Sequence, residues 1–473
     1  MSLRARHGVS LVAVALVALA SPAAHAERIF GREVTPRGPL DADEIAARRA
    51  ALQEHLETQD LVLDGDVIRP RVPQVPAQLR DRVRDTAAPW DEPPHYATIY
   101  LNFFGGTLGS GTNAAEMQAG CVGPVDIDYP AFAGTNSSAM SMVQVFQAAM
   151  EPYAVRIAYE SAPPAHLPYS MVMMGGDPTD IGMDPGTLGV SCSSDCGDVW
   201  WRDTTFAFTE ASSSALTLGN TALQEAAHAF GLDHIDGSEH IMYPFASGGQ
   251  KIWSSACTPY NDATGGISCT YVHDAFCGDD SGMQNDDAEL LAFFGPNAPD
   301  VTAPEVTITE PADGTELPAG ADVAVAAEVT DDHEGAGWRL VVTPEGADPL
   351  ISNAYQFETS WQLADLPQGT YVIRVEAIDH DRNEGADEVT IYVGTDAPAD
   401  STASGGGSAS SSGGGSGESG DDPTGDDGTG GGTPQTGDDD GGCACTVRTT
   451  ARDVAPLALL GTVLLVGRRR RVA

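Results

Sequence analysis

The stretch TALQEAAHAFGLDH, residues 221–234, indicates how the central part of the chain folds. Residues four apart on a helix share a face, so Gln224 and His228 point the same way, with Glu225 beside them. Gly231 can end the helix with a positive φ and reverse the chain, which returns His234 toward the same point. Two imidazoles that converge beside a carboxylate form a zinc site with an adjacent general base.

A second motif, HIMYP at residues 240–244, follows closely. A methionine in a tight turn just after a metal-ligating histidine resembles the Met-turn of metzincin zinc proteases, whose helix pattern is His-Glu-x-x-His-x-x-Gly-x-x-His. The Met-Tyr-Pro form is most similar to the matrixin branch. The segment 100–106 and the cysteine-rich segment after the turn resemble myxobacterial sortase-dependent metalloproteases. The resemblance covers about residues 95–296.

The resemblance implies a role for each matching residue. His228 and His234 match zinc ligands, Glu225 matches the general base, and Met242 matches the Met-turn residue. One position departs from the pattern, because Gln224 stands where the family has its first histidine. An amide oxygen is a neutral, hard donor that suits Ca²⁺ or Mg²⁺ better than Zn²⁺.

Three interpretations of Gln224 follow. It holds zinc weakly and the enzyme works; or His240 or Asp233 takes its place; or the site is inactive and the domain binds peptides or serves only as structure. The predicted function is a zinc-dependent endopeptidase of extracellular proteins and peptides. The alternative is a catalytically lapsed surface binding or adhesion protein with the same metzincin fold.

Metzincins are often kept latent by a propeptide residue that caps the zinc. No cysteine precedes Cys121, which excludes a cysteine switch. The sequence LDGD at residues 63–66 resembles the Phe-x-Gly-Asp switch of astacins, with Asp66 as the capping ligand. Asp-Gly is also an ordinary turn sequence.

The N-terminus predicts export. Residues 1–26 combine a basic start, an apolar run and an Ala-x-Ala end, as a secretory signal peptide does. Residues 27–94 are polar and end in proline-rich sequence, so they form a propeptide or a solvated arm. Within them, Asp41 as N-cap and Glu44 three residues later predict a helix over 41–56.

Apolar patterns predict an α/β domain over 95–296. We expect strands at 96–104, 154–159, 169–174 and 199–208, and helices at 136–150, 215–230 and 286–294. Residues 304–394 change to short alternating strands, at 306–309, 323–329, 338–342, 356–363, 371–378 and 388–393, separated by turn residues. This pattern predicts an all-β sandwich and resembles bacterial immunoglobulin-like domains.

In an exported chain the cysteines are expected to form disulfides. The six central cysteines are Cys121, Cys192, Cys196, Cys257, Cys269 and Cys277. They predict three bridges whose connectivity is open, including a local pair of Cys192 with Cys196. Zinc ligation by these cysteines is the alternative.

Charge excludes some partners. The formal net charge is -44, from 24 Lys plus Arg against 68 Asp plus Glu, and it would repel nucleic acid and anionic membrane surfaces. We expect a monomer. Structural Ca²⁺ could bind Asp279, Asp280, Asp286 and Asp287, or Asp379, His380 and Asp381, although a solvated acidic loop and a turn are the more frequent explanations of such clusters.

The C-terminal part predicts surface attachment. Residues 396–442 are rich in Ser, Gly and Asp and form a flexible tether. In residues 443–473, Cys443 and Cys445 precede a short apolar run and an arginine cluster. This resembles the myxobacterial C-terminal sorting signal, which implies a sortase-like membrane processing enzyme as partner, and membrane contact only through this segment. A retained anchor is the alternative. The expected location is the cell surface, the outer membrane or the extracellular space.

Overall fold

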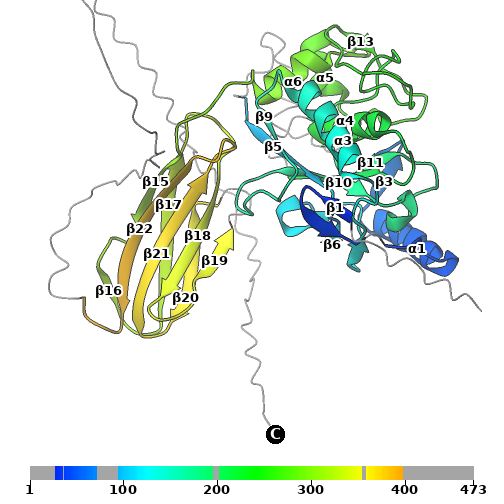
Figure 1. Ribbon diagram of the computed structural model, residues 1–473. Coiled ribbons are helices and arrows are strands. Elements are labelled where there is room, and N and C mark those ends of the chain that lie inside the picture. The colour runs from blue at the N-terminus through cyan, green and yellow to red at the C-terminus, as the bar shows by residue number, and fades with distance from the viewer. Residues whose placement is uncertain are drawn as a thin grey trace, which may run out of the picture. The chain divides into compact units, whose positions relative to one another are not determined.

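The computed structural model describes residues 27–35, 37–71, 94–194, 196, 202–353 and 358–397 (Figure 1). The chain divides into two units, Met1–Ser410 and Ser411–Ala473, and all described residues belong to the first. The predicted signal peptide, nearly all of the tether, and Cys443 and Cys445 lie outside the described residues. Among the residues described, no helix is both long and apolar enough to cross a bilayer.

The first domain is built on a seven-stranded sheet in the order β3-β4-β11-β12-β10-β5-β9. Neighbours are parallel from β12 to β9 and between β4 and β11, whereas β11–β12 and β3–β4 are antiparallel. The strands are β3 (Leu61–Asp64), β4 (Val67–Pro70), β5 (Ala97–Asn102), β9 (Val155–Ala158), β10 (Ser170–Gly175), β11 (Gly189–Ser191) and β12 (Thr204–Phe208).

Both faces of this sheet are buried, which explains the nearly continuous apolar strands. Alternate residues of β10 serve opposite faces: Val172 and Met174 join one hydrophobic cluster, and Met171 and Met173 join the other. The first cluster contains residues of α3 (Asn136–Met150), α4 (Ala215–Phe230) and α6 (Asp286–Phe294), and α3 packs against α4 (Figure 1).

The segment before residue 94 is part of the fold. Helix α1 (Ala42–Thr58) begins at Asp41, whose side chain accepts from the backbone of Glu44 in the expected capping box. Leu52 of this helix lies in the second hydrophobic cluster, and His55 Nε2 lies 2.8 Å from Gly120 O. Because β3 and β4 are strands of the main sheet, the described part of this segment is not a solvated arm.

Smaller elements were not predicted. They are β1 (Glu27–Ile29), β2 (Arg32–Val34), β6 (Gly106–Ser110), β7 (Gln118–Ala119), β8 (Ile127–Tyr129), β13 (Thr258–Pro259), β14 (Met283–Gln284), the short 3₁₀ turns Ala114–Glu116 and Pro178–Ile181, and α5 (Thr270–Cys277).

Residues 305–393 form the predicted β-sandwich. One sheet has the order β15-β17-β20 and the other β16-β22-β21-β18-β19. The strands are β15 (Glu305–Glu310), β16 (Thr315–Leu317), β17 (Ala321–Thr330), β18 (Gly337–Pro344), β19 (Leu350–Asn353), β20 (Ser360–Leu366), β21 (Gly369–Ile378) and β22 (Glu384–Val393). Alternate residues such as Ile373 and Val375 meet Val325 and Trp361 in one core.

Three disulfides lie in the first domain, as predicted: Cys121–Cys192, Cys196–Cys269 and Cys257–Cys277. Cys192 and Cys196 do not pair with each other. Cys121 follows β7 and bridges to the residue after β11, whereas Cys196 reaches the residue before α5. Each of the six sulfurs is in a disulfide, so none is left to ligate zinc.

Gly231 sets the direction of the chain after α4. It ends the helix in the left-handed region, at φ 104°, and Leu232 N donates to Ala227 O. We predict that Gly231→Ala lowers the free energy of unfolding by about 1–2 kcal/mol, because a residue with a Cβ is strained at this φ. Thermal melting measures the change. Gly38→Ala, at an exposed glycine with open space around it, is the control and is expected to leave stability unchanged.

Candidate metal centre

Helix α4 carries the predicted site residues on a buried face. Its N-cap Ser214 accepts a hydrogen bond from Thr217 N, and every residue from Leu218 to Phe230 is buried. Glu225 is 1% exposed and His228 is also 1% exposed. After the reversal at Gly231 the chain brings His234, which is 0% exposed, back to His228.

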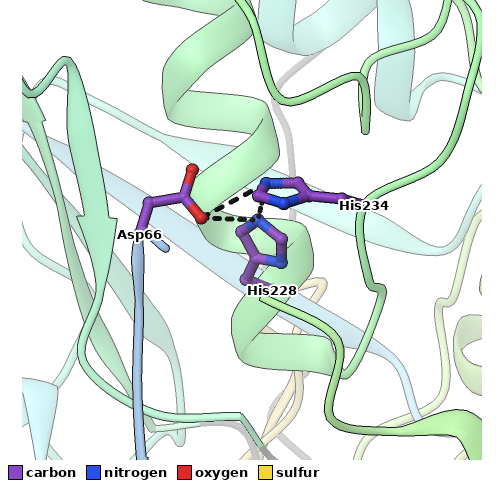
Figure 2. Close-up of side chains that lie close together, drawn as sticks. All are labelled: Asp66, His228 and His234. Atoms are coloured by element: carbon purple, nitrogen blue, oxygen red, sulfur yellow. Dashed lines mark hydrogen bonds and ion pairs between the residues drawn. The ribbon is translucent and has the colours of Figure 1, made fainter. Parts of the chain in front are cut away.

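The two imidazole rings face each other through their Nε2 atoms. His228 Nε2 lies 3.1 Å from His234 Nε2 (Figure 2). Each Nδ1 faces a backbone carbonyl: His228 Nδ1 lies 2.7 Å from Leu232 O, and His234 Nδ1 lies 2.9 Å from Gly265 O. A carbonyl oxygen only accepts, so each Nδ1 carries a proton, and in a neutral imidazole each Nε2 then presents a lone pair.

Two such lone pairs that face each other repel unless a proton or a metal ion lies between them. A third donor completes the group, because Asp66 Oδ1 lies 3.5 Å from His228 Nε2 and 3.2 Å from His234 Nε2 (Figure 2). Zinc bound tetrahedrally at about 2.0–2.1 Å would place its ligand atoms about 3.3 Å apart. The three observed separations match this value, and the histidine–carbonyl pairs match the usual outer shell of a zinc site. The residues present therefore fit zinc.

Asp66 reaches the histidines from the turn between β3 and β4. Gly65 allows the close approach: its φ is 67°, and a Cβ there would lie 2.7 Å from Thr264 O. Burial raises the pKa of Asp66, but the neighbouring His228 and His234 more than offset this and hold that pKa below its usual value. Asp66 is thus an anionic donor at the place where the sequence resemblance put a capping ligand.

The pKa values of His228 and His234 shift in opposite directions. Burial lowers the pKa of His228 to about 4, although the charge of Asp66 opposes the shift. Burial also lowers the pKa of His234, but its contact with Asp66 outweighs this, and the pKa lies above its usual value. His228 is therefore held neutral, as a metal ligand must be.

Glu225 lies beside the group formed by Asp66, His228 and His234 but is not one of its donors. Its Oε2 is buried and has no hydrogen-bond partner, and burial, with the charge of Asp66, raises its pKa well above the usual value. Gly189 of β11 makes room for this side chain, because a Cβ there would lie 2.5 Å from Glu225 Cγ. A carboxylate with a raised pKa beside a metal site can accept a proton from a water molecule there, which is the property that a general base needs.

Gln224 and Met242 both make contacts through the segment 240–244 or its neighbours. Gln224 Nε2 donates to Tyr243 O at 3.2 Å, so this segment holds the amide nitrogen. Met242 is fully buried in the core, and its carbonyl accepts from Ile235 N. The backbone of Met242 is thus tied to the residue that follows His234.

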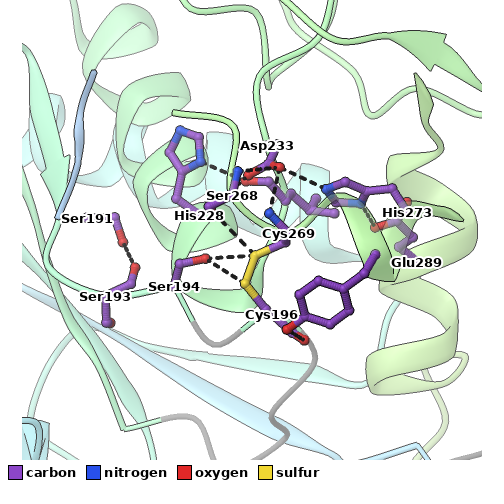
Figure 3. Close-up of a disulfide and its surroundings, with 12 residues drawn as sticks. Ser191, Ser193, Ser194, Cys196, His228, Asp233, Ser268, Cys269, His273 and Glu289 are labelled. Atoms are coloured by element: carbon purple, nitrogen blue, oxygen red, sulfur yellow. Dashed lines mark hydrogen bonds and ion pairs between the residues drawn. A yellow bond between two sulfur atoms is a disulfide. The ribbon is translucent and has the colours of Figure 1, made fainter. Parts of the chain in front are cut away.

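Neither predicted substitute for Gln224 belongs to the metal group. Asp233 points away from it and accepts hydrogen bonds from Ser268 N and Cys269 N, while its Oδ2 lies 3.2 Å from His273 Nε2 (Figure 3). His240 is not in the metal group either, and its Nε2 lies 3.8 Å from Glu239 Oε1. The third donor is instead Asp66, which sequence reasoning had assigned only to latency.

Asp233 has a structural role. Its carboxylate and that of Glu289 lie on either side of the fully buried His273, whose Nδ1 is 2.7 Å from Glu289 Oε2 (Figure 3). Burial lowers the pKa of His273, but the two carboxylates outweigh this and raise it to about 10. The charged triad fixes the residue before His234 against the start of α5, next to the Cys196–Cys269 disulfide.

The predicted calcium clusters are not observed as such. In the described part of the chain, Asp279, Asp280, Asp286 and Asp287 form no common metal-binding group. Asp286 accepts from Ser254 N and Gln284 Nε2. In the second cluster, His380 Nδ1 lies 2.9 Å from Thr98 Oγ1 and Asp381 pairs with Arg156, which leaves Asp379 to group with other residues.

A cleft of about 550 Å³ lies over the site. Asp66, Gln224, Glu225 and Tyr243 are among its lining residues, whereas His228 and His234 are not. The β3–β4 turn therefore separates the histidines from the cleft. Gly189 of β11 also lines the cleft. Strand β4 covers the edge of β11: Ser191 pairs with Val67, and Ser191 N donates to Asp66 O.

Comparison with known proteins identifies the second domain. Residues 304–375 match the family of bacterial Ig domains. No curated protein matches the chain. Similar solved structures include fibronectin(III)-like modules of Clostridium thermocellum CbhA, at 18% identity, TM-score 0.15, covering 19% of this chain and 93% of that one. Another is the PKD domain of human KIAA0319, at 20% identity, TM-score 0.14, covering 22% and 92%.

We predict that Asp66→Asn weakens zinc binding by the full chain about a few hundred-fold, because four ligands share about 10–16 kcal/mol in a zinc site. Competition with a chromophoric chelator measures the affinity. Asp64→Asn is the matched control, since Asp64 lies in the same turn but pairs with Arg69. Unchanged zinc affinity in Asp66→Asn would show that Asp66 is not a ligand.

Proposed function

We propose that the first domain is a zinc-dependent endopeptidase of extracellular proteins, held latent in the full chain by Asp66. One observation carries the proposal: His228 Nε2, His234 Nε2 and Asp66 Oδ1 meet at zinc-ligand separations beside a buried, unpartnered Glu225. The resemblance of residues 221–244 to metzincins supports the same function.

The residues have distinct roles in this proposal. Zinc, when bound, acts as a Lewis acid toward the carbonyl of a peptide bond. His228 and His234 hold it, and the carbonyls of Leu232 and Gly265 keep their Nε2 atoms in the ligating tautomer. Glu225 accepts the proton of the attacking water and passes it to the leaving amine. The buried Met242 supports the segment that carries His234.

Latency rests on two contacts of the β3–β4 hairpin. Asp66 fills the position beside both histidines that the carbonyl of a substrate must reach. Strand β4 also covers the edge of β11, where an extended substrate could otherwise add as a strand. Activation would therefore need the hairpin to leave, and Gln224 would become the remaining candidate for the third ligand.

Surface display is part of the proposal. Bacterial Ig domains are typically extracellular, and the disulfides suit an oxidising compartment. Residues 1–26 would direct export, and residues 443–473 would be processed at Cys443 or Cys445 by a sortase-like membrane enzyme.

A second candidate is a lapsed metzincin-fold protein that binds other proteins at the surface. The observation that favours it is the residue at position 224: Gln224 Nε2 donates to Tyr243 O, and only a neutral amide oxygen, a poor zinc donor, is left at the first ligand position. In this case Asp66 would remain in place as a permanent part of the fold.

Activity separates the two candidates. We predict that a full chain carrying Asp66→Ala and Gln224→His, cleaved at a protease site inserted between residues 72 and 93, degrades an unstructured protein such as casein. The double change removes the cap and restores an imidazole at the first ligand position. Adding Glu225→Gln is expected to lower kcat about 10²–10⁴-fold without loss of zinc, because the general base is lost.

The parent chain, cleaved at the same inserted site, separates the two candidates. The endopeptidase proposal expects weaker but measurable casein cleavage that Glu225→Gln abolishes, whereas a lapsed protein shows none. If the double variant binds one zinc per chain and still leaves casein intact, the endopeptidase proposal fails. The surface-binding function is then the better account.

A further inference from the structure

Three aspartates meet at one end of the β-sandwich. Asp300 precedes β15, Asp331 follows β17, and Asp379 follows β21. One carboxylate oxygen of each lies within 4.8 Å of the others. Asp300 is 7% exposed and Asp379 is 3% exposed. Three segments distant in the sequence therefore bring negative charge into one mostly buried position.

Few cationic groups offset this charge: the charge of Arg382 interacts with that of Asp379, and His333 lies beside Asp300. Among the described residues, no arginine or lysine forms an ion pair with any of the three aspartates. The nearby Arg156 is engaged by Asp381, at 2.7 and 2.6 Å. The other close nitrogen is His333 Nδ1, 3.1 Å from Asp300 Oδ2, and its hydrogen bond goes to Asp332.

Two carboxylate oxygens of the group are buried without a hydrogen bond. They are Asp300 Oδ2 and Asp331 Oδ2, and the side chain of Asp300 is 2% exposed. A buried, unsatisfied carboxylate oxygen is costly unless a ligand fills the gap. These two atoms are a second sign of a missing partner, independent of the clustering.

Backbone and amide donors hold the carboxylates in place. Asp300 Oδ1 accepts from Thr302 N, and Asp331 Oδ1 accepts from Asp332 N. Asp379 accepts from both the backbone and the side chain of Asn383. Burial, together with the charges of Asp379 and Asp300, raises the pKa of Asp331 to about 7.

We propose that Asp300, Asp331 and Asp379 form a Ca²⁺ site at this end of the immunoglobulin-like domain. Hard carboxylate oxygens select a hard cation. Calcium suits them better than magnesium, because Ca²⁺ accepts irregular arrangements of protein oxygens whereas Mg²⁺ demands near-ideal octahedral geometry. The ion would join the segment before β15 to the loops after β17 and β21. This site is independent of the proposed zinc centre.

Calcium titration of the full chain tests the proposal. Isothermal calorimetry is expected to give one saturable site with Kd about 10⁻⁴–10⁻³ M, the range of extracellular calcium modules. Asp331→Asn and, separately, Asp300→Asn are expected to weaken it at least about ten-fold, since each removes one of three charged ligands. Asp348→Asn, at an exposed position of the same domain, is the matched control and keeps the parent affinity.

The melting temperature with and without calcium gives a second readout, one that a merely misfolded variant would not reproduce. Without calcium, Asp331→Asn is expected to melt at or above the temperature of the parent chain, because it removes a repulsive charge. With calcium, the parent melting temperature rises and that of Asp331→Asn does not. Absence of a saturable calcium site in the parent overturns the proposal, as does unchanged binding in both variants. Selective binding of zinc in place of calcium also overturns it.

Discussion

The candidate metal centre depends on two backbone carbonyls, those of Leu232 and Gly265, which fix the histidine tautomers. Without them, either Nε2 could carry a proton, and the convergence of the two rings would be an ordinary hydrogen bond. Leu232 O is in position because Gly231 reverses the chain, and Gly265 O because the glycines of the 264–266 loop adopt positive φ. The helix supplies the ligands, and the loops around it decide their chemistry.

Those loops are in turn held in place by buried ion pairs and by a disulfide. His273 lies between two buried carboxylates and ties the residue before His234 to α5 and α6. Removing one partner from such a buried set is strongly destabilising, because it leaves an uncompensated charge. The disulfide at Cys269 lies beside the same segment. A small number of non-local contacts thus fixes the segment that carries His234, which suits a site whose ligand atoms must be in place before an ion binds.

The sequence was most informative where the pattern was local. The helices over 136–150, 215–230 and 286–294 have the expected bounds, because apolar periodicity and caps define them. Strand β11, only Gly189–Ser191, is too short to show a period, and α5 has no side-chain cap at Cys269. The disulfide partners, 71 and 73 residues apart for two of the bridges, depend on tertiary contacts that no spacing rule gives.

The difference between local and non-local patterns also applies to the candidate site. Glu225, His228 and His234 come from one motif, so a helix and a turn suffice to bring them together. The approach of Asp66 requires β4 to pair with β11, and this pairing is invisible in either segment alone. Asp300, Asp331 and Asp379 are similarly scattered, and only the sandwich topology collects them.

The pairing of β4 with β11 also bears on solubility. An uncovered strand edge presents free N–H and C=O groups that invite pairing with another chain, and so promotes aggregation. The hairpin hides this edge of β11 as long as it stays in place. Loss of the segment would open this edge, and the protein would then depend on charge repulsion to stay dispersed, which the strongly acidic full chain, with its net charge of -44, favours.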